Sequence, residues 1–105
     1  MSDFDGLADT TLRHLVDVID AAIGEEIDVD LQGGVLTIDL PSGHYVLNKH
    51  GPNRQLWLAS PESGAWHFDW DAAAGVWRSS RGGEVILTTL LSEELEKATG
   101  VRVAM

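Results

Sequence analysis

The sequence predicts an α+β fold, a two-layer α/β sandwich in which N- and C-terminal helices pack on one face of a five- to seven-stranded antiparallel sheet. Three observations predict it. Apolar residues recur with a helical period at both ends of the chain, apolar and polar residues alternate in the middle, and short turns rich in glycine and proline separate the alternating stretches. A chain of 105 residues can build one hydrophobic core, so we expect a single domain over residues 1–105.

The first helix is predicted over about residues 3–23. Its apolar side chains have the spacing of one helix face, at Phe4, Leu7, Ala8, Leu12, Leu15, Val16, Ile19 and Ile23. Ser2, with Asp5 three residues later, is the predicted N-cap, and Gly24 is the predicted stop. The last helix is predicted from about Leu87, where no good N-capping residue is found, to a stop at Gly100.

The middle of the chain predicts a meander of short antiparallel strands. The alternating stretches are residues 27–31, 35–40, 44–48, 55–59, 66–70 and 76–78. Gly33-Gly34 is typical of a two-residue hairpin turn, and further turns are predicted at residues 41–43, 51–53, 61–64 and 81–83. Connections this short favour antiparallel neighbours.

The alternation within residues 55–59 predicts which way Trp57 points. Two helices can cover only one face of the sheet, so the aliphatic residues of each strand must point toward them. Here these residues are Leu56 and Leu58, which leaves Gln55 and Trp57 on the open face. We therefore expect Trp57 to be a surface tryptophan.

Composition excludes several classes of function. With 7 basic and 17 acidic residues the formal charge is −10, so a phosphate backbone would be repelled and we expect no nucleic-acid partner. The absence of cysteine excludes disulfides and thiolate metal sites. No apolar run is long enough to span a membrane. The sequence MSDFDGLAD lacks the features of a secretory signal, so we expect a cytoplasmic protein.

Two stretches of the sequence resemble the frataxin family, whose bacterial members are called CyaY. They are GGVLTIDL at residues 33–40 and YVLNKHGPNRQLWLASPESGAWHFDW at residues 45–70. The family pattern is roughly GVLT, YVINKQ, then WLSSP and SGP before FDW, a further tryptophan, and a leucine-rich final helix. The likeness extends from Leu7 to Leu95, most of the chain. It implies two helices on an antiparallel sheet, in agreement with the periodicity.

The resemblance also implies a function. Frataxins bind iron weakly, as Fe²⁺ or Fe³⁺, through acidic residues of the first helix and first strand, and they bind the cysteine desulfurase and the iron–sulfur scaffold protein. It therefore implies an iron-binding protein that delivers iron to, or regulates, iron–sulfur cluster assembly. We expect a bacterial monomer, with an iron-dependent oligomer as an alternative. A further alternative is an interaction module that regulates the desulfurase and binds metal only incidentally.

An acidic ridge along the first helix and first strand is the predicted metal site. Carboxylate oxygens suit iron and other hard cations, and without histidine or thiolate such a ridge should bind loosely. The alternative is a solvated helix face. With the resemblance, the predicted ligands are Asp9, Asp17, Asp20, Glu25, Glu26, Asp28 and Asp30. Arg13 lies within the arc of the ridge and should repel cations, so we favour the lower end over Asp9.

The open sheet face is the predicted partner surface. An exposed tryptophan surrounded by amides has the composition of a protein–protein hot spot. The predicted partner-binding residues are Asn48, Lys49, Asn53, Gln55, Trp57 and His67. For Trp57 the alternative is a tryptophan packed under a loop. Lys49 either meets acidic groups of a partner or only keeps the sheet edge soluble.

We expect no dedicated enzymatic activity. Ser60, Ser63, His67 and Asp69 permit a triad interpretation, but no nucleophile elbow or glycine-rich oxyanion loop accompanies them. Carboxylates on an open helix face also lack the pocket that would shift their pKa values. Frataxins are also described as having ferroxidase activity, so iron oxidation and detoxification stay as an alternative implied by the resemblance.

Overall fold

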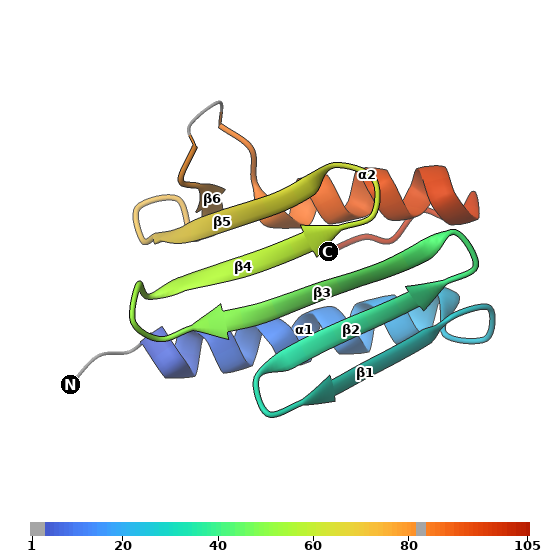
Figure 1. Cartoon of the computed structure of the whole chain (residues 1–105), viewed down its shortest axis with the longest axis horizontal. Coiled ribbons are helices and arrows are strands. Elements are labelled where there is room, and N and C mark those ends of the chain that lie inside the picture. Colours follow the sequence, from blue (N-terminus) through green and yellow to red (C-terminus); the bar gives the residue numbers. More distant parts are fainter. Residues whose placement is uncertain (1–3, 82–83) are drawn as a thin grey trace.

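The predicted two-layer sandwich is confirmed. The computed structural model describes residues 4–81 and 84–105, and Figure 1 shows both helices behind one face of the sheet. The helices are α1 (Phe4–Ile23) and α2 (Leu87–Thr99). The six strands are β1 (Asp28–Gln32), β2 (Val35–Leu40), β3 (Gly43–His50), β4 (Gln55–Ser60), β5 (Gly64–Asp71) and β6 (Val76–Ser79).

The sheet is a simple meander in which every strand pairs antiparallel with the next along the chain. The spatial order is β1-β2-β3-β4-β5-β6. The β1–β2 hairpin turns at Gly33 and Gly34, whose φ angles of +57° and +80° are those that favour glycine. Because Gln32 pairs with Val35, the register of the whole hairpin is fixed and brings Asp28 opposite Asp39.

The hydrophobic core lies between the sheet and the two helices. The predicted stripe of α1 is buried except for Leu7 and Val16, which are partly buried, and the three leucines of α2 that face the core are fully buried: Leu87, Leu91 and Leu95. Alternate residues of the strands meet them, so Leu56 and Leu58 point into the core as the alternation predicts. Each element therefore buries one face only, and most of the polar side chains of the strands lie on the outer face of the sheet.

The C-terminal segment completes the core. After Gly100, whose φ of +76° ends α2 in the left-handed conformation, the chain returns behind the sheet between the two helices (Figure 1). Val103 is fully buried, and its carbonyl accepts a hydrogen bond of 2.7 Å from the Ser92 hydroxyl on α2. The segment therefore adds an apolar side chain to the core, although it has no regular secondary structure.

Both ends of the predicted helices agree with the structure where it describes them. Ile86 precedes α2 with extended dihedral angles and no side-chain cap, as the missing N-cap signal indicated. The predicted N-cap Ser2 and the turn residues 82–83 lie outside the described part of the chain. None of the described helices is long and apolar enough to cross a bilayer.

Candidate functional site

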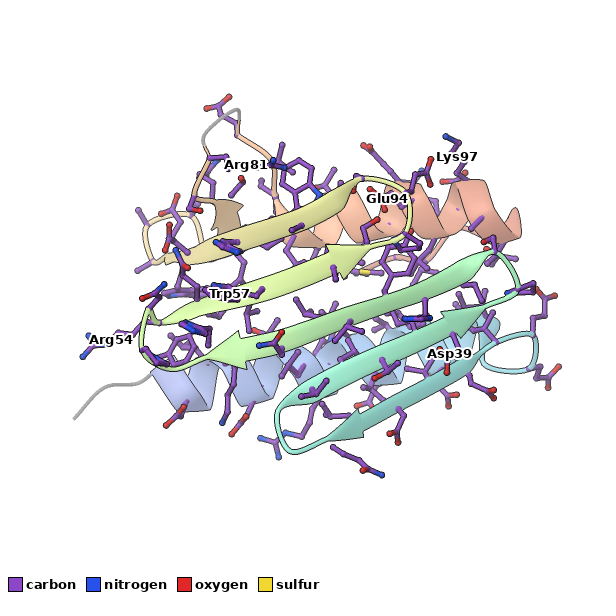
Figure 2. The ribbon with its side chains drawn as sticks, in the orientation of Figure 1. Asp39, Arg54, Trp57, Arg81, Glu94 and Lys97 are labelled. Carbon is purple, nitrogen blue, oxygen red and sulfur yellow. The ribbon has the colours of Figure 1, made fainter. Side chains whose placement is uncertain are left out.

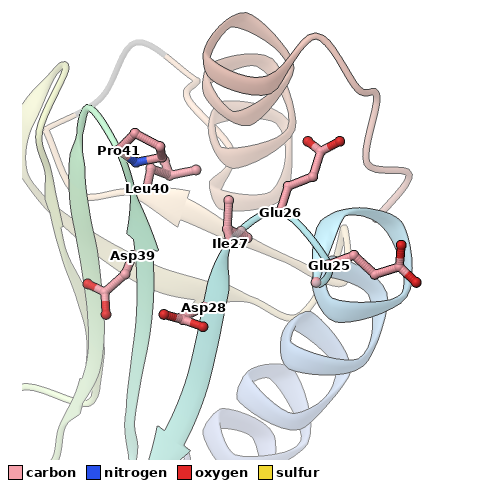
Figure 3. A pocket seen from close by; sticks show the side chains of 8 residues that line it. Glu25, Glu26, Ile27, Asp28, Asp39, Leu40 and Pro41 are labelled. Carbon is pink, nitrogen blue, oxygen red and sulfur yellow. The ribbon is translucent and has the colours of Figure 1, made fainter.

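The lower end of the acidic ridge lies where α1 passes into the first hairpin. Glu25, Glu26, Asp28 and Asp39 line a shallow hollow of about 350 Å³, shown in Figure 3. A neighbouring hollow of about 550 Å³ lies along residues 20–26 and shares both glutamates. Six of the predicted ligands are exposed here and take part in no ion pair among the described residues: Asp17, Asp20, Glu25, Glu26, Asp28 and Asp30.

Asp39 is an acidic residue of this end that the sequence prediction missed. It lies on β2 directly opposite Asp28, and both side chains are exposed on the open face of the sheet. Figure 3 shows the two carboxylates on the same side of the hairpin. The signal was present in the sequence, because a two-residue turn at Gly33-Gly34 places the residues at positions 28 and 39 opposite each other.

Gly24 makes the tight passage from α1 to the hairpin possible. Its amide donates to the Asp20 carbonyl oxygen at 2.8 Å, and a Cβ at this position would lie 2.2 Å from the Asp20 carboxylate oxygen Oδ1. No side chain fits there without displacing the carboxylate. The glycine therefore brings the last acid of the helix close to Glu25 and Glu26.

The acidic side chains do not converge on one metal-sized point. No group of three or more histidine, cysteine, aspartate or glutamate side chains is arranged to hold a metal ion within residues 4–81 and 84–105. In Figure 3 the carboxylates of Glu25 and Glu26 point away from those of Asp28 and Asp39. Such an arrangement can attract hard cations through its field and single carboxylates, but it offers no preformed coordination shell.

Asp9, the predicted ligand at the upper end, is engaged by Lys49. The Lys49 ammonium donates to the Asp9 carboxylate at 3.1 Å and lies 3.5 Å from Asp5. The hydrogen bond that Lys49 donates to Asp9 raises the pKa of Lys49. Arg13 makes no ion pair with this group and donates to the Asp9 carbonyl oxygen at 3.4 Å. Of the two cationic side chains near Asp9, Lys49 is therefore the one that competes with a metal ion.

Lys49, one of the predicted partner-binding residues, lies on the opposite side of the sheet from Trp57. Alternation along β3 turns Asn48 to the open face and Lys49 to the helix side, where α1 lies. The Lys49 side chain runs over Gly34, where an added Cβ would lie 3.0 Å from its Cε atom. Lys49 thus ties β3 to the first turns of α1 and is held away from the face that carries Trp57.

Trp57 lies on the open face of the sheet, as predicted, but its indole is not bare. The side chain is half-buried, and the ring is stacked on both flat faces. Its Nε1 donates to the Gln55 side-chain oxygen at 2.9 Å. Figure 2 shows Trp57 on β4, well separated from Asp39 on the same face. The alternative of a tryptophan packed under a loop is not observed, since the covering groups are side chains of the sheet itself.

The remaining predicted partner residues surround Trp57. His67 is its direct partner across β4 and β5, and Asn48 is its partner across β3 and β4. Asn53 lies in the exposed turn after β3, where its backbone amide donates to His50 at 3.3 Å. His50 belongs to this cluster although it was not among the predicted partner residues, because its place beside Trp57 depends on a diagonal contact between strands.

The serines of the triad interpretation are engaged elsewhere. The Ser60 and Ser63 hydroxyls each donate to the carboxylate of Glu94 on α2, at 2.6 Å. His67 instead stacks on Trp57, on the other side of the sheet. The four residues therefore do not form a hydrogen-bonded triad.

The fold and its site define a small acidic α/β sandwich with an open, polar sheet face, and comparison with known proteins gives its family. The frataxin-like domain model matches residues 1–101. The chain belongs to the frataxin family.

Curated relatives agree with this assignment. The chain is 44% identical over 104 residues to mitochondrial frataxin of Arabidopsis thaliana, covering 93% of this chain and 54% of that protein. It is 45% identical over 96 residues to the mitochondrial frataxin homolog of Saccharomyces cerevisiae, covering 87% and 53%. The chain thus spans about half the length of these two relatives. Mitochondrial frataxin of Caenorhabditis elegans is 37% identical, with coverage of 91% and 74%.

Solved structures give the same fold. Frataxin from Psychromonas ingrahamii, described as a member of the CyaY protein family, superposes with a TM-score of 0.84 at 27% identity and covers 98% of this chain and 96% of that one. Trimeric yeast frataxin superposes with a TM-score of 0.78 at 45% identity, covering 88% and 78%. Trimeric yeast frataxin complexed with ferrous iron superposes at 0.73 with 41% identity, covering 95% and 88%.

Proposed function

We propose that this protein binds iron weakly at its acidic end and delivers iron to, or regulates, iron–sulfur cluster assembly by binding the cysteine desulfurase and its scaffold protein. The observation that carries the proposal is the division of one sheet face into two surfaces. At one end of the face, near Asp28 and Asp39, lie exposed carboxylates without ion-pair partners among the described residues. A cluster of rings and amides surrounds Trp57 toward the other end (Figure 2).

Charge and ligand chemistry support the iron part. A formal charge of −10 draws cations and basic protein surfaces toward the chain, and oxygen ligands suit iron better than soft metals. A frataxin of similar fold has been solved with ferrous iron. Because the ligands here are exposed and dispersed, iron would be held loosely, as suits a cargo that must be released.

The partner part is supported by the composition of the Trp57 surface. A large aromatic side chain with amide neighbours is the usual make-up of an interface hot spot. The acidic end would meet a basic patch of the desulfurase while the Trp57 surface meets the scaffold. We propose a monomer as the working form, with an iron-dependent oligomer as the alternative.

A second candidate is an interaction module that regulates the desulfurase and binds metal only incidentally. The observation that favours it is the absence, among the described residues, of three or more convergent metal-ligating side chains. The acidic end would then act only by steering the protein to a basic partner.

A desulfurase and cluster-formation assay with the cognate partners, with and without Fe²⁺, separates the two candidates. The test variant replaces Asp17, Asp28 and Asp39 by asparagine. The charge-matched control replaces the exposed Glu84, Glu93 and Glu96 by glutamine. Loss of both ferrous binding and the iron-dependent effect in the test variant alone supports the iron role. Loss of ferrous binding with normal regulation at matched ionic strength supports the module.

We further propose that the protein does not act as an enzyme. Oxygen uptake during Fe²⁺ oxidation checks this, since a ferroxidase would exceed the uncatalysed rate. A cytoplasmic, bacterial setting stays a prediction: the curated relatives are mitochondrial proteins, whereas the Psychromonas neighbour is of the CyaY type.

A further inference from the structure

The indole of Trp57 is enclosed between two imidazoles. The His50 ring lies 3.8 Å from the indole, centroid to centroid, with 8° between the planes, and the His67 ring lies 4.2 Å away on the other side, at 10°. The three rings form a parallel stack that spans β3, β4 and β5. Both flat faces of the indole are therefore already in contact with this chain's own side chains.

The polar edge of the indole is fixed as well. Its Nε1 donates to the Gln55 oxygen Oε1 at 2.9 Å, and the Gln55 amide nitrogen donates to the Asp69 carboxylate at 3.0 Å. The Asp69 carboxylate accepts only, so it settles which end of the Gln55 amide faces the indole. The orientation of Trp57 is thus restrained on two faces and along one edge.

The His50 imidazole is anchored by a hydrogen bond to the backbone, whereas for His67 it is the main chain that is held in the sheet. The Nδ1 atom of His50 accepts a hydrogen bond of 3.3 Å from the Asn53 amide in the turn after β3. His67 lies within β5, where its carbonyl oxygen accepts from the Ser80 amide at 2.8 Å. The two histidines belong to different strands, so either one can be replaced while the other stays in place.

We propose that His50 and His67 are positioning residues: they clamp the indole of Trp57 so that a partner meets its edge and cannot stack on its face. The clamp itself is a property of the free protein, whereas its effect on a partner rests on the proposed function. Ring edges are electropositive, so the group that fits the stack is an acceptor oxygen, a main-chain carbonyl or a carboxylate of the partner. A side chain held in its bound orientation also loses less entropy on binding.

The free protein gives the first test, by ¹H–¹³C NMR of the histidine rings. The chain has four histidines, and His14 and His44 serve as internal references because neither contributes to the stack. The ring protons of His50 and His67 should resonate upfield of those references through the indole ring current, and Trp57→Leu should remove the difference. Resonances of His50 and His67 that do not respond to Trp57→Leu would overturn the clamp.

Binding to the cognate desulfurase–scaffold complex gives the second test. Replacing His50 or His67 by alanine should weaken binding about two- to tenfold, the usual worth of an aromatic pair. Phenylalanine at either position restores a stacking ring and should restore affinity, while His44→Ala on the same face of β3 should bind like the parent. Equal affinity of the alanine and phenylalanine variants at both positions would overturn the positioning role.

The two tests separate two kinds of failure. If the unaltered protein does not bind the complex, the proposed partner is wrong, and the NMR comparison alone decides whether the clamp exists. If the protein binds but the alanine variants bind equally well, the partner stands and the clamp does not set its affinity.

Discussion

The hydroxyl of Tyr45 on β3 donates a hydrogen bond of 2.9 Å to the carboxylate of Glu94 on α2, 49 residues further along the chain. The same carboxylate accepts from Ser60 and Ser63 at the β4–β5 turn, at 2.6 Å each. Ser63 in turn accepts from the Trp66 indole at 2.9 Å. Glu94 is only 8% exposed, and a buried carboxylate needs hydrogen-bond donors. The three donors that it has here join α2 to the sheet (Figure 2).

Replacing Glu94 by alanine should lower the free energy of unfolding by about 3 kcal/mol, because it removes charge-assisted bonds and leaves the buried Tyr45 hydroxyl without an acceptor. Urea denaturation followed by circular dichroism measures the change. The control is Glu93→Ala on the exposed side of the same helix, expected within about 0.5 kcal/mol of the parent. Equal effects of the two substitutions would contradict a supporting role for this cluster.

The free energy of unfolding should also fall at alkaline pH, because Tyr45 loses its proton more readily in the unfolded chain than in the folded protein. Burial, and then the bond to Glu94, raise the pKa of Tyr45 above its ordinary value of 10.0. A pKa raised on folding stabilises the native state below the unfolded value, and this contribution is lost as pH rises from 10 toward the folded value. Tyr45→Phe should therefore show a shallower loss of unfolding free energy between pH 10 and 11. Part of the loss will persist, because folding also raises the pKa values of Lys49 and Lys97 through their bonds to Asp9 and Glu62.

Asp39→Asn should raise stability and weaken cation binding together. Asp28 and Asp39 are directly opposed on neighbouring strands, and like charges in that position are destabilising, so the substitution should add up to about 1 kcal/mol. Thermal denaturation and titration with Fe²⁺ under anaerobic conditions give the two quantities. Asp71→Asn is the control: Asp71 is paired with Arg78 at 3.0 Å, so its replacement should neither raise stability nor weaken iron binding. Unchanged iron binding in the Asp39 variant would remove this residue from the acidic site.

Val103→Ala should lower the free energy of unfolding by about 2 kcal/mol. Val103 is fully buried, so the shorter side chain leaves a cavity in the core. Urea denaturation measures the change. Arg102→Ala, at the neighbouring exposed position, is the matched control and should be nearly neutral. A neutral result at Val103 would mean that the C-terminal segment is not part of the core.

Periodicity predicted the elements of this fold because each of them buries one face. The stripe of α1, the turn at Gly33 and Gly34, and the stop at Gly100 follow from local chemistry, and the structure confirms them. Burial of Val103 could not be predicted in this way, because a segment without regular structure has no period from which to infer it.

The site was predicted less completely, because its contacts run between strands. Counting outward from the two-residue turn would have placed Asp39 opposite Asp28, so its position could have been predicted from the sequence. The two roles expected of Lys49 did not include its ion pairs with α1, although alternation from Asn48 turns it to the helix side. The stack on Trp57 depends on side-chain rotamers and sheet twist, which alternation does not specify.

The first strand, β1, is an outermost strand of the sheet, with Asp28 and Asp30 exposed along it. The β1 edges of two copies of the chain repel one another while these carboxylates are ionised and unpaired. This repulsion opposes pairing of β1 with the β1 strand of a second copy. Cations that gather on these carboxylates would cancel that repulsion. We therefore expect metal loading and self-association to be coupled through the same pair of side chains.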